Sequence, residues 1–317
     1  MRILVTGGAG FIGSHIVAAL LKHPEVSLVR VMDNLATGSI KNITEFKDHP
    51  KFEFYETDIR DYQSCLEACT DIDRITHQAA LGSVPRSIND PLTTNDVNIT
   101  GTLNVFTAAK ENNIKRIVYA ASSSTYGDHP GLPKVEDKIG KPLSPYAVTK
   151  FVNELYAKVY GELYGLELIG LRYFNIFGPR QNPAGPYAAV IPLFAEAILK
   201  NEQPVINGDG KHSRDFTFVD NAVQANLLSL FTTNNEAINQ VYNIACGEQT
   251  SLNELYEGLR KEAGTSIAPK HGPERTGDVK HSLADISKAK QLLGYEVKVA
   301  VKDGLQRTFR WYRDQVS

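Results

Sequence analysis

Residues 2–13 read RILVTGGAGFIG, and the class of fold follows from this stretch. Ile3, Leu4 and Val5 form a contiguous apolar run, which is typical of a strand buried on both faces. Glycines follow at the spacing Gly-x-x-Gly-x-x-Gly, and a helical pattern then runs from Phe11 to Lys22. The stretch therefore predicts a strand, a tight turn and a helix.

The three glycines of this turn are Gly7, Gly10 and Gly13. The first permits the tight turn, the second lets the backbone approach a pyrophosphate, and the third lets the helix pack on the strand. The N–H groups of the first helical turn would then face the phosphates. In this strand–turn–helix context the spacing predicts a dinucleotide-binding site.

A second apolar run, Leu28–Met32, ends at Asp33, about twenty residues after the glycines, where dinucleotide-binding folds place an acidic residue. A carboxylate there can hold both hydroxyls of an adenosine ribose and would repel a 2′-phosphate. We therefore expect NAD rather than NADP. The alternative is that Asp33 caps a turn or a helix.

Strand and helix patterns alternate through the first half of the chain. Further strands are expected at Lys51–Glu56, Asp73–His77, Lys115–Ala121 and Leu166–Arg172, and helices at Asp61–Cys69, Pro91–Asn112 and Ser144–Tyr164. This alternation predicts an α/β fold with a Rossmann-like, doubly wound parallel sheet.

The alternation loosens in the second half. Helices are expected at Tyr187–Lys200, Val219–Thr232, Leu252–Ala263, Ile286–Leu293 and up to about Arg313, with short strands near Pro204–Ile206, Asp215–Thr217 and Val241–Asn243. We predict an NAD-binding domain over residues 1–175, completed by later elements that return to the sheet. A smaller, mixed α/β substrate lobe would cover residues 176–317.

Ligands of such sheets bind at the carboxyl ends of the strands. Besides the glycine turn and Asp33, the expected strand ends carry Asp58, Gln78-Ala79-Ala80 and Ser122-Ser123-Ser124. Asp58 is placed to meet an adenine amino group, with Ile59 against the ring. The convergence of five strand ends indicates one site more strongly than any single motif.

Tyr146 and Lys150 share one face of a helix because they lie four residues apart. A cation beside a phenol favours the phenolate and lowers the tyrosine pKa from its ordinary value of about 10. Such a phenol can act as a general base and acid. The alternative is a surface tyrosine packed on the stem of a lysine.

The composition excludes several classes of protein. The chain has 317 residues, 42% apolar and 22% charged, with a net charge of −2, so it offers no electrostatic case for nucleic acid or an anionic membrane. It has no apolar run of the ~18 residues that a membrane span needs, and its strand-like start leaves no room for a signal peptide. The three cysteines, Cys65, Cys69 and Cys246, suit a reducing compartment and lack the neighbours of a metal site. We expect a cytoplasmic protein without a metal.

The glycine motif, Asp33, Ser122 and Tyr146-x-x-x-Lys150 together resemble the extended short-chain dehydrogenase/reductases of the NAD-dependent epimerase/dehydratase type. Residues 77–87, 121–128, 207–210 and 213–216 are similar to the UDP-N-acetylglucosamine 4-epimerases of bacterial surface-polysaccharide pathways, and the resemblance covers essentially the whole chain. It implies an isomerase with tightly bound NAD. That enzyme would interconvert UDP-N-acetylglucosamine and UDP-N-acetylgalactosamine through a 4-keto sugar, with UDP-glucose and UDP-galactose as a further pair. It also implies a homodimer formed through Pro91–Asn112 and Ser144–Tyr164.

The resemblance assigns roles to individual residues. Tyr146 would be the catalytic base, Lys150 would support it, and Ser122 would hydrogen-bond the sugar 4-oxygen. The cofactor-binding residues would be Gly7, Gly10, Phe11, Ile12, Gly13, Asp33, Asn34, Thr37, Gly38, Asp58, Ile59, Gln78, Ala79, Ala80, Asn98, Tyr146, Lys150 and Tyr173. The substrate-binding residues would be Gly82, Ser83, Ser122, Ser123, Ser124, Tyr146, Asn175, Ala189, Val190, Asn207, Arg214, Arg275, Asp278 and Ser282.

Several alternatives stay open at this point. Ser123 and Ser124 stand where related 4,6-dehydratases carry an acid pair, so dehydration is not expected, although both serines could merely cap their loop. UDP-glucose and UDP-glucuronate 4-epimerases share the same triad, and Arg214 and Arg275 could be surface ion-pair residues. A non-catalytic NAD-binding regulator would be expected to lack the triad. The small residues at Ser282 and at Gly82-Ser83 favour a sugar with an N-acetyl group.

Overall fold

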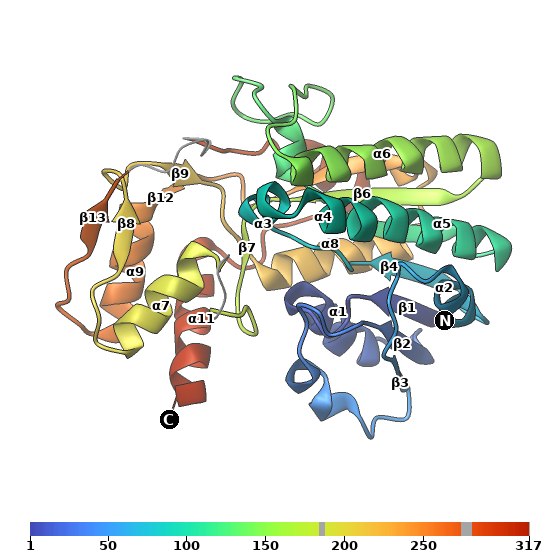
Figure 1. Ribbon diagram of the computed structural model, residues 1–317, viewed down its shortest axis with the longest axis horizontal. Helices are drawn as coiled ribbons and strands as arrows, with labels where there is room; N and C mark the ends of the chain where they lie inside the picture. Colours follow the sequence, from blue (N-terminus) through green and yellow to red (C-terminus); the bar gives the residue numbers. More distant parts are fainter. Residues whose placement is uncertain (184–187, 274–280, 317) are drawn as a thin grey trace.

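Seven parallel strands form the central sheet of the protein, a computed structural model of which describes residues 1–183, 188–273 and 281–316 (Figure 1). The strand order is β11-β6-β5-β4-β1-β2-β3. The strands are β1 (Arg2–Thr6), β2 (Leu28–Met32), β3 (Phe52–Tyr55), β4 (Arg74–His77), β5 (Arg116–Ser122), β6 (Glu167–Tyr173) and β11 (Gln240–Ile244). The order reverses between β1 and β4, so the predicted doubly wound parallel sheet is confirmed.

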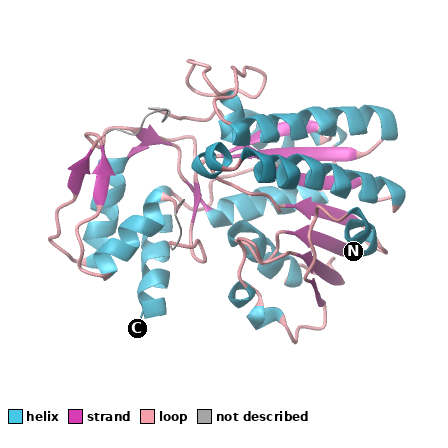
Figure 2. Cartoon of the chain, viewed as in Figure 1, coloured by secondary structure: helices cyan, strands magenta, loops and turns pink. Residues whose placement is uncertain are grey.

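Helices cover both faces of this sheet, as Figure 2 shows. On one face lie α1 (Phe11–Leu21) and α8 (Val219–Phe231), and on the other lie α2 (Tyr62–Cys69), α5 (Gly101–Glu111) and α6 (Pro145–Tyr164). Because successive side chains of a strand point to opposite faces, Ile3 and Val5 pack in one core and Leu4 packs in the other. The apolar run of β1 is thus buried on both sides.

The expected helix Pro91–Asn112 is helical along nearly its whole length but is not uniform. It consists of α4 (Pro91–Asn95), a π-helical turn labelled η3 (Asp96–Thr100) and α5. Such single wide turns are often found at functional sites. Here the wide turn carries Asn98, whose side chain is fully buried.

The smaller lobe is built from α7 (Val190–Leu199), α9 (Leu252–Ala263) and α11 (Val301–Val316), which pack on one another. Short strand pairs join it: β8 (Val205–Asn207) with β13 (Lys270–Gly272), and β9 (Ser213–Arg214) with β12 (Thr250–Ser251). As predicted, β11 and α8 come from late in the chain and return to the main sheet. The boundary between residues 175 and 176 stays a prediction.

The remaining described elements are short. They are α3 (Val84–Asn89), α10 (Ser287–Leu293), the strands β7 (Ile176–Phe177) and β10 (Thr217–Phe218), which pair with each other, and the 3-10 turns η1 (Ile40–Asn42), η2 (Thr44–Phe46), η4 (Ser123–Tyr126) and η5 (Asn235–Ala237). Neither α3 nor β13 was expected from the sequence. The predicted helix start at Tyr187 lies outside the described residues.

The expected strand Asp215–Thr217 is wrong in its bounds, because β9 ends at Arg214 and β10 begins at Thr217. The cause is Asp215, a fully buried carboxylate. It accepts hydrogen bonds from the backbone N–H groups of Cys246, Gly247 and Ala284. Asp215 therefore joins its own segment to those around Cys246 and Ala284. These contacts interrupt the regular strand that was expected here.

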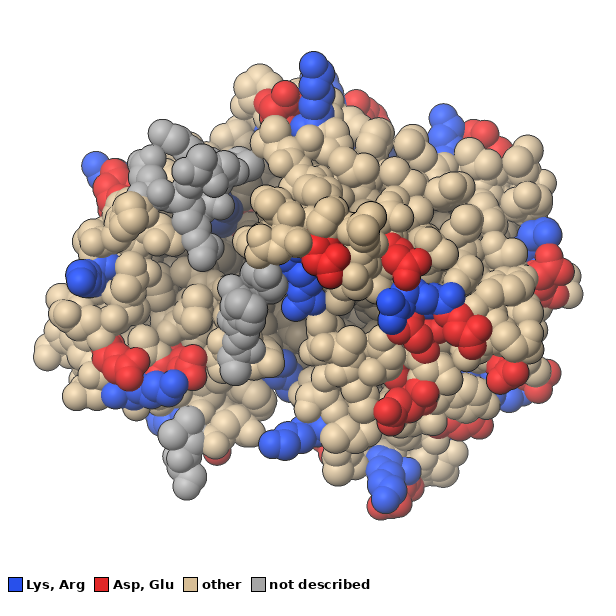
Figure 3. Space-filling model, viewed as in Figure 1, with Lys and Arg blue, Asp and Glu red and all other residues tan. Residues whose placement is uncertain are grey.

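Charged side chains of both signs are dispersed over the face of the molecule shown in Figure 3. This dispersion agrees with the net charge near zero. Among the helices of the described ranges, none combines the length and the apolar character that a membrane crossing requires. Within the same ranges, no cluster of three or more His, Cys, Asp or Glu side chains could hold a metal ion.

Candidate functional site

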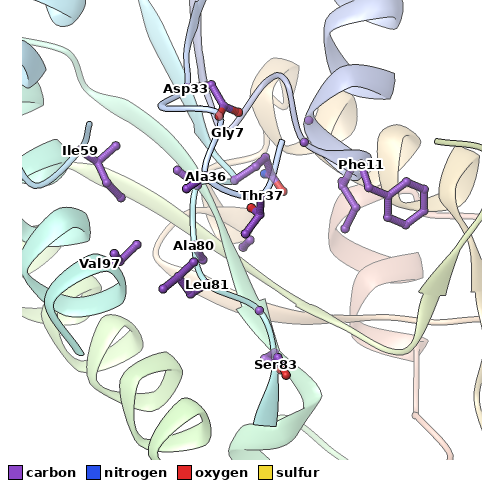
Figure 4. A pocket seen from close by; sticks show the side chains of 18 of the residues that line it. Gly7, Phe11, Asp33, Ala36, Thr37, Ile59, Ala80, Leu81, Ser83 and Val97 are labelled. Atoms are coloured by element: carbon purple, nitrogen blue, oxygen red, sulfur yellow. The ribbon is translucent and has the colours of Figure 1, made fainter. Parts of the chain in front are cut away.

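A cavity of about 600 Å³ opens at the carboxyl ends of the strands. Residues from all of the predicted strand ends line it, including the glycine turn, Asp33, Asp58, Gln78 and Ser122. Figure 4 shows part of this lining, with Gly7, Asp33, Ile59 and Ser83 on separate segments around one space. We call this the first cavity. The predicted convergence of the strand ends on one site agrees with this geometry.

The glycine turn can only be built from glycine. Gly7 has a φ of +69°, and a Cβ atom on Gly13 would lie 2.1 Å from the Gly7 carbonyl oxygen. Helix α1 therefore begins tightly against the end of β1, with Gly10 as its N-cap. This leaves a backbone cradle of the kind that fits a pyrophosphate, so the residues present fit a dinucleotide cofactor.

Asp33 lines the first cavity at the end of β2 and also holds the turn around it. Its carboxylate accepts hydrogen bonds from the N–H groups of Ala9 (2.9 Å) and Leu35 (2.8 Å). Burial raises the pKa of this carboxyl, and the backbone donors oppose that shift. The sequence left two roles open for Asp33, which were to cap a turn or to face the ribose of a cofactor. The structure shows hydrogen bonds of the capping kind, and Asp33 also lines the first cavity.

Asp58 and Ile59, which were predicted to meet the adenine, line the first cavity together with Arg60, a neighbour that the sequence analysis missed. Arg60 donates to Asp58 through Nε (3.1 Å) and Nη2 (2.8 Å), and Asn34 donates to the same carboxylate at 2.7 Å. The hydrogen bonds from Arg60 lower the pKa of Asp58 to about 2. The signal that could have found Arg60 is its position two residues after a strand-end aspartate.

Helix α6 brings Tyr146 and Lys150 to the first cavity. The helix begins as the sequence suggested, since Ser144 caps it by accepting from the N–H of Ala147 and Pro145 occupies its first turn. Lys150 is 4% exposed, and its ammonium donates to the carbonyl of Ala120 at 2.8 Å. Burial lowers the pKa of Lys150 to about 8.

The pKa of Tyr146 differs in direction from the expectation. Burial of the phenol raises this pKa, and a hydrogen bond with Ser122 lowers it in part. The predicted lowering is therefore wrong for the protein as described, because removal of the phenol from water outweighs the favourable contact. Ser122 also accepts hydrogen bonds from the N–H (3.2 Å) and the hydroxyl (2.9 Å) of Ser124.

Two predicted cofactor contacts have other roles. Asn98 does not line the first cavity; it is buried behind the wall, where it accepts from the N–H of Leu81 and donates to Thr149. Tyr173 does line the cavity, but its hydroxyl donates to Gln78 at 3.0 Å and accepts from Asn226 at 2.7 Å. The Asn98 amide thus positions Leu81, a residue of the lining, and the contact of Asn98 with the cofactor stays a prediction.

A second cavity of about 270 Å³ adjoins the first. Its lining includes the predicted substrate residues Asn175, Ala189, Val190, Asn207 and Arg214. The two cavities share Asn175, Ile176 and Gln181. Sequence reasoning missed Gln181 and His212, and nothing in their local pattern distinguishes them from other loop residues.

The remaining predicted residues divide into three groups. The first group lines the first cavity and consists of Phe11, Ile12, Asn34, Thr37, Ala79, Ala80, Gly82, Ser83 and Ser123. The second group lines neither cavity and consists of Gly38, Ser124 and Ser282. The hydroxyl of Ser282 accepts a hydrogen bond from the N–H of Asp215 at 3.3 Å. Gly38 packs so closely that a Cβ atom on it would lie 2.9 Å from the backbone of Ala9. Arg275 and Asp278 lie outside the described residues.

Residues 3–245 match the NAD dependent epimerase/dehydratase family. The chain belongs to this family. It is 41% identical to a UDP-N-acetylglucosamine 4-epimerase from Methanobrevibacter ruminantium M1, solved in complex with UDP-N-acetylmuramic acid, with a TM-score of 0.93 over 99% of this chain and 98% of that one. The Thermotoga maritima UDP-glucose 4-epimerase, solved with UDP-glucose, is 36% identical with a TM-score of 0.93 over the whole of both chains.

A third solved member of the family is the UDP-glucose 4-epimerase of Thermus thermophilus in complex with NAD. It is 35% identical, with a TM-score of 0.88 over 99% of each chain. The resemblance found in the sequence is thus confirmed. The protein is an NAD-dependent epimerase, and its first cavity has the residues that such a cofactor requires.

Proposed function

We propose that the protein is a UDP-N-acetylglucosamine 4-epimerase that forms UDP-N-acetylgalactosamine reversibly and serves polysaccharide synthesis. The observation that carries the proposal is the junction of the two cavities at Asn175, Ile176 and Gln181. A nucleotide diphosphate in the second cavity would direct its hexose through this junction toward Tyr146. Arg214 would neutralise the diphosphate from the wall of the second cavity.

NAD, when bound, supplies a reversible acceptor for the hydride of the sugar C4. Side chains of the protein would transfer the proton of the sugar 4-hydroxyl. Tyr146 would take the proton of the 4-hydroxyl and return it after the sugar has turned about its diphosphate, while Ser122 would hold the 4-oxygen by a hydrogen bond. Lys150, buried one helical turn after Tyr146, would place a positive charge that favours the phenolate.

The charges of the first cavity favour a neutral sugar over a uronate. Among the described residues of its lining, the cations are Arg60 and Lys150. Arg60 is paired with Asp58 at the adenosine end, and Lys150 donates to Ala120. A substrate carboxylate would therefore lack a dedicated partner among these residues. The small lining residues Gly82 and Ser83 leave space beside the hexose, and this favours an N-acetylated sugar.

A homodimer is part of the proposal because α6 exposes an apolar stripe. Residues four or seven apart on one helix lie on the same face, and such a stripe is costly to leave in water. The exposed apolar residues are Val148, Leu155, Val159 and Leu163 on α6, with Leu92 on α4, which contacts α6. Exposure reaches 82% at Leu92 and 69% at Leu163. Two copies packed through this stripe would cover it.

The deciding experiment incubates the purified protein with UDP-N-acetylglucosamine and no added cofactor. Appearance of UDP-N-acetylgalactosamine would support both the substrate and the retained NAD. UDP-glucose and UDP-glucuronate are assayed in parallel, and preferential turnover of either would replace the proposed sugar. Tyr146→Phe serves as the inactive control, since it removes the hydroxyl but keeps the ring that lines the cavity.

A further inference from the structure

The segment that joins the two cavities leaves the main sheet after β6 and passes between the two lobes. Its short strand, β7, lies between the smaller lobe and the main sheet in Figure 1. Asn175, Ile176 and Gln181 of this segment line both cavities. We call residues 175–181 the junction segment. Its position decides where a sugar would pass from the second cavity toward Tyr146.

The junction segment turns sharply at Arg180. This residue has a φ of +65°, in the left-handed region that residues other than glycine rarely adopt. Such a conformation persists only when the surrounding structure holds the residue in place. The contacts of Arg180 therefore have to offset the cost of its backbone conformation.

The side chain of Arg180 docks on α1 and η2, two elements that precede the junction segment by more than a hundred residues. Its Nη1 donates to the carbonyl oxygen of Ser14 on α1 at 3.2 Å, and its Nη2 donates to the carboxylate of Glu45 on η2. The guanidinium carbon lies 5.8 Å from the centre of the Phe46 ring. Although Arg180 is charged, its side chain is only 17% exposed. One planar guanidinium thus contacts a carbonyl, a carboxylate and an aromatic ring, which a lysine ammonium cannot reproduce.

The residues on either side of Arg180 are held as well. The carbonyl oxygen of Pro179 accepts a hydrogen bond from Nε2 of His15 at 2.9 Å, since a carbonyl can only accept. On the other side, the hydroxyl of Tyr312 on α11 donates to the carbonyl oxygen of Gln181. The junction segment is therefore fixed between α1 and α11 of the smaller lobe, with Arg180 at its centre.

The surface on which Arg180 docks is attached to the glycine turn. The side chain of Asn42, two residues before η2, donates to the carbonyl oxygen of Ala9 at 2.9 Å, and Ala9 lies within the glycine turn. The ring of His15 contacts that of Phe11 edge-on, with 5.9 Å between the ring centres, and Phe11 lines the first cavity (Figure 4). Arg180 thus links the junction segment to the turn that would hold NAD.

We propose that Arg180 is a positioning residue for the hexose of the substrate, which holds the junction segment at a fixed place relative to the NAD site. The inference rests on the proposed function, because the hexose would reach Tyr146 through the junction. The second cavity would anchor the uridine diphosphate, so loss of the Arg180 contacts should leave the affinity for UDP almost unchanged. The orientation of the hexose toward Tyr146 should be lost instead, and small errors of orientation are costly to catalysis.

The test is Arg180→Met in the holoenzyme, which keeps the length of the side chain and removes its charge and its hydrogen bonds. We expect kcat with UDP-N-acetylglucosamine to fall by about 10- to 100-fold. The dissociation constant of UDP, its binding stoichiometry and the content of bound NAD should be almost unchanged, which would show that the loss is not due to a misfolded fraction. An unchanged kcat, or an affinity for UDP that falls as much as kcat does, would overturn the proposal.

Arg30→Met is the matched control. Arg30 on β2 has the same kinds of partner as Arg180, because it donates to the carboxylate of Glu53 at 2.8 Å and to the carbonyl of Ala68 at 3.0 Å. Its guanidinium carbon lies 4.8 Å from the centre of the Tyr55 ring, and Arg30 lines neither cavity. Both variants should have a lower melting temperature, whereas only Arg180→Met should lose kcat. Equal losses of kcat would mean that Arg180 acts through general stability and would refute a positioning role.

The partner of Arg180 offers a second test. Glu45→Gln keeps an acceptor for the guanidinium and removes the charge, so kcat should fall less than in Arg180→Met. The double variant should be no worse than Arg180→Met alone, because residues that act through one contact have non-additive effects. A double variant in which the two losses multiply would show that Arg180 and Glu45 act independently, contrary to the proposal.

The outcome can be told apart from failure of the proposed function. If the wild type epimerises neither UDP-N-acetylglucosamine nor UDP-glucose, the proposed function fails, and hydrogen exchange with bound UDP-glucose replaces kcat as the measurement. Peptides covering residues 205–216 report on the second cavity, and peptides covering 175–181 report on the junction segment. UDP-glucose should protect both sets in the wild type but only the first set in Arg180→Met. Absence of protection at the junction segment in the wild type, or protection retained there in the variant, would overturn the role of Arg180 by itself.

Discussion

The ammonium nitrogen of Lys150 donates a hydrogen bond to the carbonyl oxygen of Ala120 at 2.8 Å. This bond joins helix α6 to the last residues of β5, two positions before Ser122. Ser122 is in turn paired in register with Tyr173 of β6. Lys150 therefore has a structural role besides its charge, since it sets the distance between the helix with Tyr146 and the strand end with Ser122.

Epimerisation is expected to decline as the pH rises through about 8, because burial lowers the pKa of Lys150 to about 8. The charged lysine is present below that value and is lost above it, so the positive charge that favours the phenolate is fully available only on the acid side. The measurement is kcat against pH, with the melting temperature followed over the same range. A profile that rises steadily through pH 9 while the protein stays folded would contradict the role of Lys150.

Tyr146→Phe should reduce kcat by about 10²–10⁴-fold, the usual contribution of a positioned acid–base group. The ring would still line the first cavity, so bound NAD and the melting temperature should be almost unchanged. Product formation is measured by separating the two UDP-sugars, and NAD is quantified after denaturation. Full epimerisation by this variant would refute the mechanism and leave the fold assignment intact.

Gly13→Ala should prevent the cofactor turn from closing. Its Cβ would lie 2.1 Å from the Gly7 carbonyl oxygen, which is backbone and cannot move aside. We expect a loss of about 1–3 kcal/mol of stability and of copurifying NAD. Gly258→Ala on α9 is the control, since its Cβ meets only the end of the Leu305 side chain, at 3.1 Å. Equal effects of both substitutions would argue against a special role for the turn.

Ser282→Tyr tests the proposed preference for an acetylated sugar. Ser282 lies behind the wall of the second cavity, since its N–H donates to the Ser213 carbonyl and the next residue, Arg214, lines that cavity. A tyrosine at this position is expected to narrow the substrate space from behind, lowering turnover of UDP-N-acetylglucosamine by about tenfold or more with UDP-glucose less affected. Ser282→Ala is the matched control, because it removes the hydroxyl that accepts the Asp215 N–H without adding bulk. If the tyrosine variant keeps its activity on the acetylated sugar, the steric argument fails.

Leu163→Glu should give a monomer in solution if two copies pack through α6. Leu163 is 69% exposed in the single chain, so a charge there would cost little in the monomer but would be buried in the dimer. Light scattering after size exclusion reports the mass. Lys302→Glu, an exposed position on α11, should leave the mass unchanged. A wild-type monomer would contradict the proposed dimer directly.

Local patterns in the sequence were sufficient wherever the chemistry is local. The glycine spacing, the aspartate at the end of β2 and the Tyr-x-x-x-Lys spacing each depend on residues within one turn or one helix, and all of them lie at the first cavity. Predictions failed where a side chain acts across the fold. Asp215 was placed in a strand, although distant backbone N–H groups determine its conformation.

The assignment of Asn98 to the cofactor came from the family resemblance and stays a prediction. Only the tertiary structure shows its hydrogen-bond partners, which are the backbone of Leu81 and the hydroxyl of Thr149 on α6. The direction of the Tyr146 pKa also needed the tertiary structure, because the degree of burial cannot be read from a spacing of four residues.

Periodicity and short motifs were enough to predict the parallel sheet, the NAD cofactor and the helix face that Tyr146 shares with Lys150, because they encode strands, turns and one side of a helix. The pKa values of the site residues and the contacts between the elements that carry them depend on the tertiary structure. Gly7 and Tyr146 are far apart in the sequence but line the same cavity. The packing of the parallel sheet brings these strand ends and helix α6 together. The burial of Lys150 depends on α6 packing against β5 and β6, and this long-range contact lowers the pKa of its ammonium.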